Sequence, residues 1–343
     1  MAAEETGLAG DISEDPILQL GSGFRAAKLL FVANEVGVFE QLATGPTSLN
    51  GLAERTGLAP PRLRVIVNAM LAVGMIEAND GEYRNSPVAA AFLSGPDSEG
   101  LRPALRFWNR FSYPVWMKLE DAVRTGQPQS GRASWTEEQQ QIFSEGVEAI
   151  TRGAAQALVD RYDFGRHARV LDLGGGTGSW LVAILRRHSH LRGTLVERVG
   201  AAAIARSRLA SESATQNVEI IEGDFFRDPV PPGHDVVLVA HVLHGNTPAR
   251  NLELLHRIRA SVPEGARLLL ADDWTDPTHT LPALAPLFAG EFFVFSGEGD
   301  VYSEEEVHAW LNESGWKPVG FTALAGPQSV IIAETAVQFR RDT

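Results

Sequence analysis

The residues best suited to hold a nucleotide lie in one glycine-rich segment, Val170-Leu-Asp172-Leu-Gly174-Gly-Gly176-Thr-Gly178. A short apolar run precedes the glycines and a helical pattern follows them, which predicts a strand, a turn and a helix. At such a turn, glycines let the backbone approach a ligand closely. The spacing differs from the Gly-x-Gly-x-x-Gly pattern of dinucleotide sites, and Asp172 suits the cationic aminoacyl end of S-adenosylmethionine.

Acidic residues also follow the next two predicted strands. Glu197 ends the second strand, where a carboxylate can bind both ribose hydroxyls, although it could instead be a solvated acid at a helix start. After the third strand come Asp224 and Phe225. The carboxylate can accept from an adenine amino group, and the phenyl ring can pack against the adenine. The three strand ends therefore predict one adenosyl site.

The elements that must position these residues alternate regularly from residue 169 onward. Strand-like runs begin at residues 170, 193, 218, 235 and 267, with helices near 179–188, 200–211, 248–262 and 303–314. Apolar strands separated by helices predict a doubly wound α/β fold with a mostly parallel, Rossmann-like sheet. Two further strands near 316–324 and 329–334 are joined by a loop, which predicts an antiparallel hairpin at the sheet edge.

The first third of the chain reads as mostly helical. One helix is expected from residue 18 to 40, a second from Ser48 as N-cap, and a third from about 62 to 73. Two short strands around Asp80-Gly81 follow, so the order is that of a winged helix. Such a module either binds DNA or serves structure and dimerisation. The third helix offers only Arg62 and Arg64 and the chain carries a net charge of -13, so nucleic-acid binding is not expected.

Aromatic residues collect in two other segments. A helical stretch over 101–163 and a later apolar helix over 287–295 could together line an acceptor pocket, although core packing explains some of these side chains equally well. The expected pocket residues are Trp108, Phe111, Trp116, Phe143, Phe288 and Phe292. We therefore expect three parts: a dimerisation domain over 1–100, a helical linker over 101–163, and a catalytic domain over 164–343.

Taken together, these motifs resemble the class I S-adenosylmethionine methyltransferases. The winged-helix region followed by the Asp-x-Gly-x-Gly-x-Gly domain is similar to small-molecule O-methyltransferases of the caffeic acid and antibiotic-tailoring type, over about residues 16–336. The resemblance implies S-adenosylmethionine as methyl donor, a homodimer formed through the N-terminal domain, and a small acceptor from secondary metabolism.

The resemblance also implies a catalytic group. His244, after the fourth strand, matches the general base of that family, and Asp272 and Glu304 match the acids that orient it, with Asp273 and Glu305 as close rivals. An imidazole titrates near neutral pH, which suits a base that contributes about 10²- to 10⁴-fold. A simpler interpretation makes the histidine and Glu304 plain helix-capping residues.

The chain departs from the family after this histidine. Gly245-Asn246 stands where Asp-Trp is common, and Ala240 stands where a lysine is common. These changes keep open C- or N-methylation, for instance of a 2-oxo acid, and a SAM-binding enzyme that transfers no methyl. The winged-helix order keeps open a SAM-sensing regulator. His241 and His244 raise the question of a metal, but the single nearby acid argues against metal catalysis, and no metal is expected.

Composition narrows the setting of the enzyme. The chain has 343 residues and no cysteine, which excludes disulfides, thiolate nucleophiles and cysteine-based zinc sites. It has no apolar run near the roughly 18–20 residues that span a bilayer and no signal-peptide pattern. We therefore expect a cytoplasmic enzyme that acts without a membrane.

Overall fold

The computed structural model describes residues 14–96, 99–130 and 135–336. Internal contacts divide the chain into two units, Met1–Asn109 and Arg110–Thr343, and each unit is described by itself. Within the described residues, no helix is both long and apolar enough to cross a membrane. The three-part division expected from the sequence stays a prediction.

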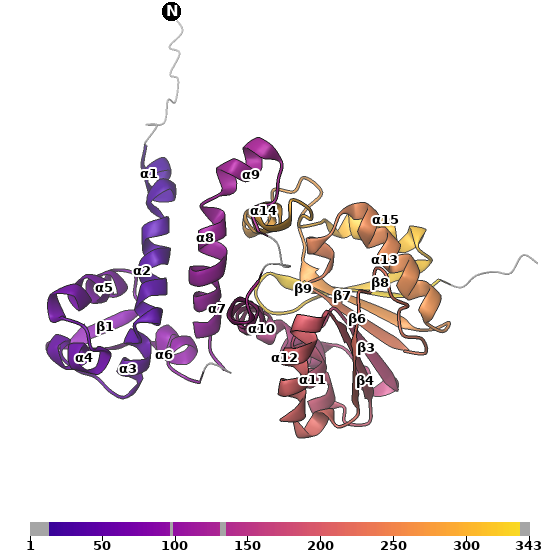
Figure 1. The fold of residues 1–343 in the computed structure, drawn as a ribbon, viewed down its shortest axis with the longest axis horizontal. Coiled ribbons are helices and arrows are strands. Elements are labelled where there is room, and N and C mark those ends of the chain that lie inside the picture. The colour runs from indigo at the N-terminus through magenta and orange to yellow at the C-terminus, as the bar shows by residue number, and fades with distance from the viewer. Residues whose placement is uncertain (1–13, 97–98, 131–134, 337–343) are drawn as a thin grey trace, which may run out of the picture. The chain divides into compact units, whose positions relative to one another are not determined.

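The N-terminal unit consists of helices and one hairpin (Figure 1). The buried side chains of Phe39, Leu52 and Leu63 belong to its core. Ser48 caps its helix by accepting from the amide of Gly51 at 3.2 Å, as expected. The elements are α1 (Asp15–Ser22), α2 (Phe24–Glu35), α3 (Val38–Ala43), α4 (Leu49–Thr56), α5 (Pro60–Ala72), β1 (Ile76–Asn79), β2 (Glu82–Asn85), α6 (Pro87–Leu93) and α7 (Arg102–Phe107).

The expected single helix over 18–40 is wrong, because the structure divides this stretch into α1, α2 and α3. The second break lies at Gly37, whose φ of +77° ends one helix and caps the next. A left-handed residue of this kind cannot continue a helix, and glycine adopts it without steric cost. The apolar spacing that predicted one helix persists across the break and conceals it.

The wing is confirmed. β1 and β2 pair antiparallel around Asp80-Gly81, and Thr47 forms an additional bridge to Tyr83. Helices α4 and α5 precede the hairpin directly. The N-terminal unit thus has the helix, helix and hairpin order that the sequence predicts.

The C-terminal unit is built on one seven-stranded sheet, as predicted. Its strands run in the order β5-β4-β3-β6-β7-β9-β8, parallel from β5 to β7 and antiparallel at β9 and β8. They are β3 (Arg169–Leu173), β4 (Arg192–Glu197), β5 (Val218–Glu222), β6 (Val236–Ala240), β7 (Arg267–Asp273), β8 (Trp316–Ala323) and β9 (Gln328–Thr335). From β3 the chain extends the sheet first to one side, through β4 and β5, and then to the other side, through β6 and β7. Ligands are therefore expected at the carboxyl end of β3.

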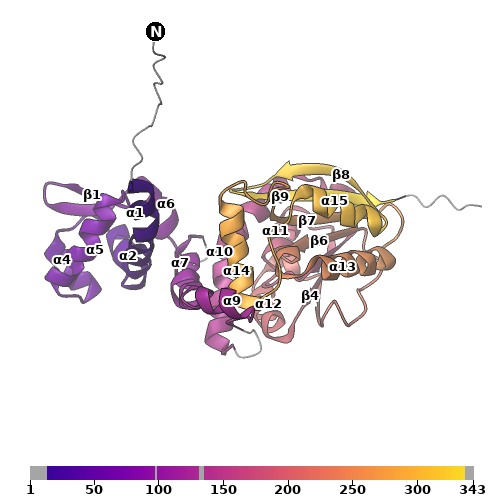
Figure 2. The same cartoon turned by 90° about the horizontal axis from the view of Figure 1, so that it is seen from above.

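Helices cover both faces of this sheet (Figure 2). Helices α10 (Glu137–Arg161), α11 (Ser179–Arg187) and α12 (Val199–Ala210) pack on one face, and α13 (Pro248–Ser261) and α15 (Glu304–Glu313) on the other. Alternation along β3 explains this, because Val170 faces the first core and Leu171 the second. The remaining elements are η1 (Trp108–Ser112), α8 (Tyr113–Trp116), α9 (Leu119–Thr125), η3 (Phe164–Arg166), η4 (Ser213–Thr215), η5 (Leu243–Gly245) and α14 (Leu284–Ser296).

Candidate functional site

The glycine-rich turn lies between β3 and α11, at the predicted switch point. Gly174 has a φ of +77°, and a Cβ added there would lie 2.8 Å from Cγ2 of Val242 and 3.4 Å from the ring of Phe225. Glu197, at the end of β4, accepts from the backbone amides of Gly176 at 3.0 Å and Arg198 at 2.7 Å. The glycine turn after β3 and Glu197 at the end of β4 are therefore in direct contact at the strand ends.

Asp172 is the unusual group beneath this turn. Its side chain is fully buried, and neither carboxylate oxygen has a hydrogen-bond partner among the described residues. Burial, followed by the nearby charge of Glu197, raises the pKa of Asp172 to about 7. A buried carboxylate without a partner is costly, and a cationic ligand group removes that cost. The site therefore fits the aminoacyl end of S-adenosylmethionine.

Beyond Glu197 lies a cavity of 660 Å³ on the side expected for adenine. Asp224 contributes to it, and one of its oxygens accepts from the amide of Phe226 at 3.0 Å. Phe225 is buried against the glycine turn, and its carbonyl accepts from Arg257 at 3.0 Å. The lining consists of Arg198, Val199, Glu222, Gly223, Asp224, Arg227 and Arg250.

A polar anchor that the sequence analysis missed holds the same turn. Thr177 donates to Glu148 of α10 at 2.9 Å and accepts from Arg208 of α12 at 3.2 Å. Arg208 and Glu148 also form an ion pair. These three residues come from separate elements, so no local pattern connects them in the sequence.

The acceptor side is dominated by the pair His244 and Asp272. His244 lies in η5 after β6, and its Nδ1 is 2.6 Å from Oδ1 of Asp272 near the end of β7. Burial alone raises the pKa of Asp272, but the charge and hydrogen bond of His244 outweigh burial and bring that pKa below its ordinary value. An ionised carboxylate only accepts, so Nδ1 of His244 carries a proton, and in the neutral imidazole this tautomer has its lone pair on Nε2.

A second histidine, His241, lies directly behind this pair. Its backbone has a φ of +56°, and its Nδ1 is 3.5 Å from Oδ1 of Asp272. Burial lowers its pKa to about 4, so the imidazole is neutral. The ring lies 6.1 Å from that of the buried Trp180 on α11. The sequence analysis considered His241 only as a possible metal ligand, and the structure makes it a neighbour of the His244–Asp272 pair.

Helix α14 supplies an aromatic wall for His244. The ring of Phe292 stacks on the imidazole with centroids 4.1 Å apart, and Phe288 meets it edge-on at 5.6 Å. One turn further, Phe295 stacks on Phe111 at 5.3 Å. The ring of Phe143 lies 5.7 Å from that of Phe111. The predicted pocket residues Phe288 and Phe292 thus lie against His244, and the predicted residues Phe111 and Phe143 lie together beside Phe295.

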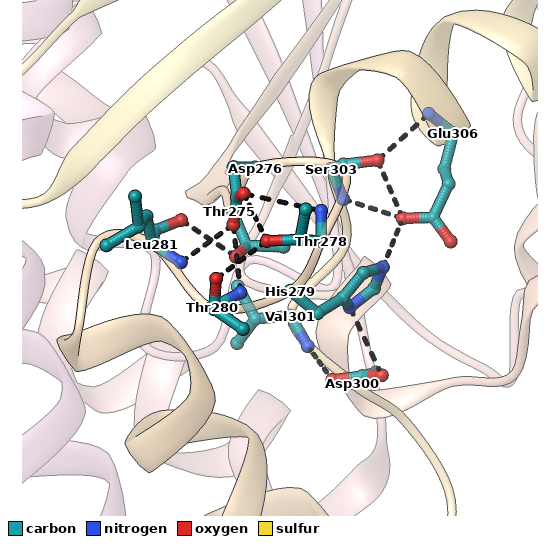
Figure 3. Close-up of polar contacts among 10 residues, drawn as sticks. All are labelled: Thr275, Asp276, Thr278, His279, Thr280, Leu281, Asp300, Val301, Ser303 and Glu306. Carbon is teal, nitrogen blue, oxygen red and sulfur yellow. Dashed lines mark hydrogen bonds and ion pairs between the residues drawn. The ribbon is translucent and has the colours of Figure 1, made fainter.

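The loop that joins β7 to α14 has its own internal support (Figure 3). Asp276 accepts from the backbone amides of Thr280 at 2.9 Å and Leu281 at 2.7 Å, and from the side chain of Thr278. The Thr278 hydroxyl and these amides hold the pKa of Asp276 well below its ordinary value. The carboxylate therefore closes the loop on itself just before α14 begins.

The same loop is tied to the start of α15 (Figure 3). Nε2 of His279 lies 3.0 Å from Glu306, whose carboxylate also accepts from the amide and hydroxyl of Ser303 at 2.8 Å each. Nδ1 of His279 lies 3.6 Å from Asp300. These contacts attach the loop that precedes α14 to the residues that lead into α15.

Two predicted residues lie apart from these groups. Glu304 begins α15, and its carboxylate is 3.5 Å from Nε2 of His308; the structure describes no contact between Glu304 and His244. Trp108 falls in the N-terminal unit and its side chain is partly exposed. Trp116 belongs to the C-terminal unit, where its indole packs against Gly290 of α14. That Glu304 orients His244 stays a prediction.

Asn246, which departs from the family pattern, serves the backbone. Its side chain donates to the carbonyl of Val242 at 2.7 Å, and its own carbonyl accepts from the hydroxyl of Tyr302 at 2.5 Å. The loop between α14 and α15 lies against η5, because the amide of Asp300 donates to the carbonyl of His244 at 3.1 Å. The Asn246 side chain therefore supports the turn that carries His244 through its bond to Val242.

Comparison with known protein families identifies both units. A family model described as an O-methyltransferase domain matches residues 116–317, and one described as an O-methyltransferase dimerisation domain matches residues 18–95. The first match covers the glycine turn, His244, Asp272 and α14.

Similar proteins span nearly the whole chain. The 3-hydroxy-5-methyl-1-naphthoate 3-O-methyltransferase of Streptomyces sahachiroi is 30% identical over 91% of this chain and 92% of its own. The tetracenomycin polyketide synthesis 8-O-methyl transferase of Streptomyces glaucescens is 31% identical over 92% and 95%. The solved mitomycin 7-O-methyltransferase is 29% identical with a TM-score of 0.80, over 94% and 98%. The chain therefore belongs to the O-methyltransferase family, whose members use S-adenosylmethionine, and it carries that family's dimerisation domain.

Proposed function

We propose that this chain transfers the methyl group of S-adenosylmethionine to a hydroxyl of an aromatic or polyketide-like small molecule. The observation that carries the proposal is the pair of His244 and Asp272, 2.6 Å apart, beneath the stacked ring of Phe292. A base held against an aromatic wall suits removal of a proton from a phenol lying on that wall. The relatives that are named for a naphthoate and for a tetracenomycin polyketide support this acceptor class.

The residues proposed to hold the methyl donor are those of the glycine turn. Asp172 receives the ammonium group of the aminoacyl end, Glu197 the ribose hydroxyls, and Asp224 with Phe225 the adenine. When bound, S-adenosylmethionine supplies an electrophilic methyl group on a sulfonium. The buried, unpartnered oxygens of Asp172 and the close approach at Gly174 support this assignment.

The protein's own contribution is to hold the acceptor and move its proton. Nε2 of His244 accepts the hydroxyl proton, and Asp272 keeps the imidazole in the required tautomer and stabilises the imidazolium. Phe288 and Phe292 exclude water and align the acceptor, which favours the transfer because the reacting groups are already in place. We keep an orienting role for Glu304 within this proposal.

Metal-assisted transfer is the second candidate, because His241, His244 and Asp272 offer ligand atoms within 4.8 Å of one another. Two histidines and a carboxylate are a common ligand set for divalent transition metals. Ligands at about 2.0–2.2 Å from one ion lie about 3 Å or more from each other. The His244–Asp272 distance of 2.6 Å is that of a hydrogen bond, which favours the base.

The proposal includes a homodimer formed through the N-terminal unit. Four apolar residues of α1 and its junction with α2 are exposed in the single chain, namely Ile17, Leu18, Leu20 and Phe24. Exposed apolar side chains grouped on one helix are typical of an interface. Cytoplasmic location stays a prediction of the sequence.

The test is mass spectrometry of products after incubation with methyl-deuterated S-adenosylmethionine and a panel of phenols, 2-oxo acids and amines, with and without a chelator. A labelled methyl on a phenolic oxygen, unaffected by the chelator, is expected. A label on carbon or nitrogen, or loss of turnover on chelation, contradicts the proposal in favour of another reaction on this scaffold. Bound S-adenosylmethionine with no transfer, together with DNA binding, points to a regulator.

A further inference from the structure

Helix α14 carries a single ionisable side chain, Glu291, in a sequence that is otherwise apolar except for Ser296 at its end. Phe288, Glu291, Phe292 and Phe295 follow the spacing i, i+3, i+4 and i+7, which places them on one face of the helix. Phe288 and Phe292 contact the ring of His244, and Phe295 contacts Phe111. Glu291 therefore lies in the middle of the aromatic wall, and the mechanism described above does not use it.

One oxygen of this carboxylate is fully engaged. Oε2 accepts from the hydroxyl of Ser112 at 2.9 Å and from the indole Nε1 of Trp116. The indole is held close to α14 because residue 290 is glycine, where an added Cβ would lie 2.7 Å from Cη2 of Trp116. The sequence thus fixes the carboxylate in one position.

The other oxygen, Oε1, is buried and has no hydrogen-bond partner among the described residues. Burial raises the pKa of Glu291, and the two donors on Oε2 oppose that rise. Leaving a buried acceptor unsatisfied is costly, and a residue serving only the fold could be replaced by an apolar one of similar size. A buried acceptor atom without a partner, beside aromatic side chains, is typical of a binding site, where a few polar groups fix the orientation of a ligand.

We propose that Oε1 of Glu291 accepts a hydrogen bond from a second O–H or N–H group of the aromatic acceptor, and so selects which hydroxyl faces His244. The inference rests on the proposed O-methylation and narrows its substrate class. The acceptor carries the hydroxyl that is methylated and, elsewhere on the same ring system, a separate hydrogen-bond donor. Side chains three and four apart on a helix lie about 5–6 Å from each other, so Glu291 neighbours both Phe288 and Phe295.

The substitution Glu291→Gln tests the proposal, because it should change which acceptor molecules the enzyme prefers in a stated direction. Both donors on Oε2 require an acceptor, so they hold the glutamine carbonyl oxygen in that place. The amide nitrogen then takes the place of Oε1 and turns an acceptor into a donor. The variant should therefore prefer an acceptor molecule that presents a lone pair where the wild type prefers a hydrogen.

The experiment measures kcat/KM for dihydroxynaphthalene isomers, for their mono-methyl ethers and for 1- and 2-naphthol. The wild type should use at least one diol about tenfold or more better than its mono-methyl ether and than the naphthols. Glu291→Gln should reverse the order of that diol and its ether. Ser112→Ala, which removes a donor from Oε2 but leaves Oε1, is the matched control and should keep the wild-type order.

Equal use of diol, ether and naphthol by the wild type would overturn this inference while leaving O-methylation intact. So would an unchanged order in Glu291→Gln, provided that the variant still binds S-adenosylmethionine as tightly as the wild type. Absence of methylation of every phenol by the wild type, with label found on carbon or nitrogen acceptors, contradicts the proposed function itself and this inference with it.

Discussion

The imidazole of His244 and the phenyl ring of Phe292 lie face to face, with centroids 4.1 Å apart and planes 16° apart. One face of the proposed base is therefore covered by an aromatic ring, while Nδ1 is held by Asp272. The ring has little freedom to rotate, and Nε2 remains for the acceptor. This stacking joins η5, which follows the central strand β6, to α14, which begins 40 residues after His244.

The stacked ring should matter for turnover more than for folding. Phe292→Leu keeps an apolar side chain but removes the planar contact, and such aromatic pairs contribute about 0.5–1.5 kcal/mol beyond area burial. We expect kcat to fall by about 2- to 10-fold, measured at saturating S-adenosylmethionine. Phe293→Leu, a more exposed position on the same helix, is the control and should leave kcat unchanged. Equal effects of both substitutions would argue against a role for the stack.

The adjacent acids Asp272 and Asp273, at the end of β7, should differ in their effect on kcat. Asp272→Asn removes the ionised acceptor of the His244 proton and permits the wrong tautomer, so kcat should fall by about 10²-fold or more. Asp273 has a pKa raised to about 6, chiefly by burial, and donates its backbone amide to Asp272. Asp273→Asn should therefore change kcat by less than about threefold. The steady-state rates of the two variants decide between them, with binding of S-adenosylmethionine checked by calorimetry.

The parts that the sequence predicted well are those set by local patterns. Apolar runs predicted the strands because β3 and β6 are buried on both faces, and the glycine spacing predicted the turn that follows β3. The common location of Asp172, Glu197 and Asp224 was predictable because parallel strands bring their carboxyl ends to one edge of the sheet, while their roles stay predictions. The same rule brought His244 and Asp272 together.

Contacts between distant segments could not be predicted in this way. Trp116 and Glu291 are 175 positions apart, and nothing local marks either as the partner of the other. The anchor of Thr177 by Glu148 depends on how α10 packs against the sheet. The break at Gly37 was missed because apolar periodicity continues through a turn that only the backbone angle reveals.

Asp172 should make binding of S-adenosylmethionine depend on pH. Burial and Glu197 raise its pKa from 3.8 to about 7, so the folded protein binds this proton more tightly than the unfolded chain does. The contribution of this group to the free energy of unfolding therefore falls as the pH rises from about 4 to about 7. A cationic ligand favours the ionised form, so affinity should rise roughly tenfold between pH 5.5 and 7.

Calorimetric titration of the wild type and Asp172→Asn at both pH values measures this dependence. The variant should bind more weakly, and its affinity should change by less than about twofold across the range. Its Tm without ligand should also fall less than that of the wild type over the same interval. A wild-type affinity that is flat with pH would show that the aminoacyl end does not bind to Asp172.

Gly299 packs against the backbone of His244, the proposed base. Its φ is +89°, and an added Cβ would lie 2.1 Å from the carbonyl oxygen of His244. Gly299→Ala must therefore displace either the loop or η5, and we expect a loss of roughly 3 kcal/mol in the free energy of unfolding together with most of the activity. Gly326→Ala is the matched control, because its φ is +61° but nothing lies within 4 Å of its added Cβ. That control should cost only about 1 kcal/mol, from the left-handed backbone alone, with kcat unchanged. Denaturant titration and kcat measured on both variants separate the two costs, and similar losses at both positions would mean that the closeness of Gly299 to His244 has no effect on the site.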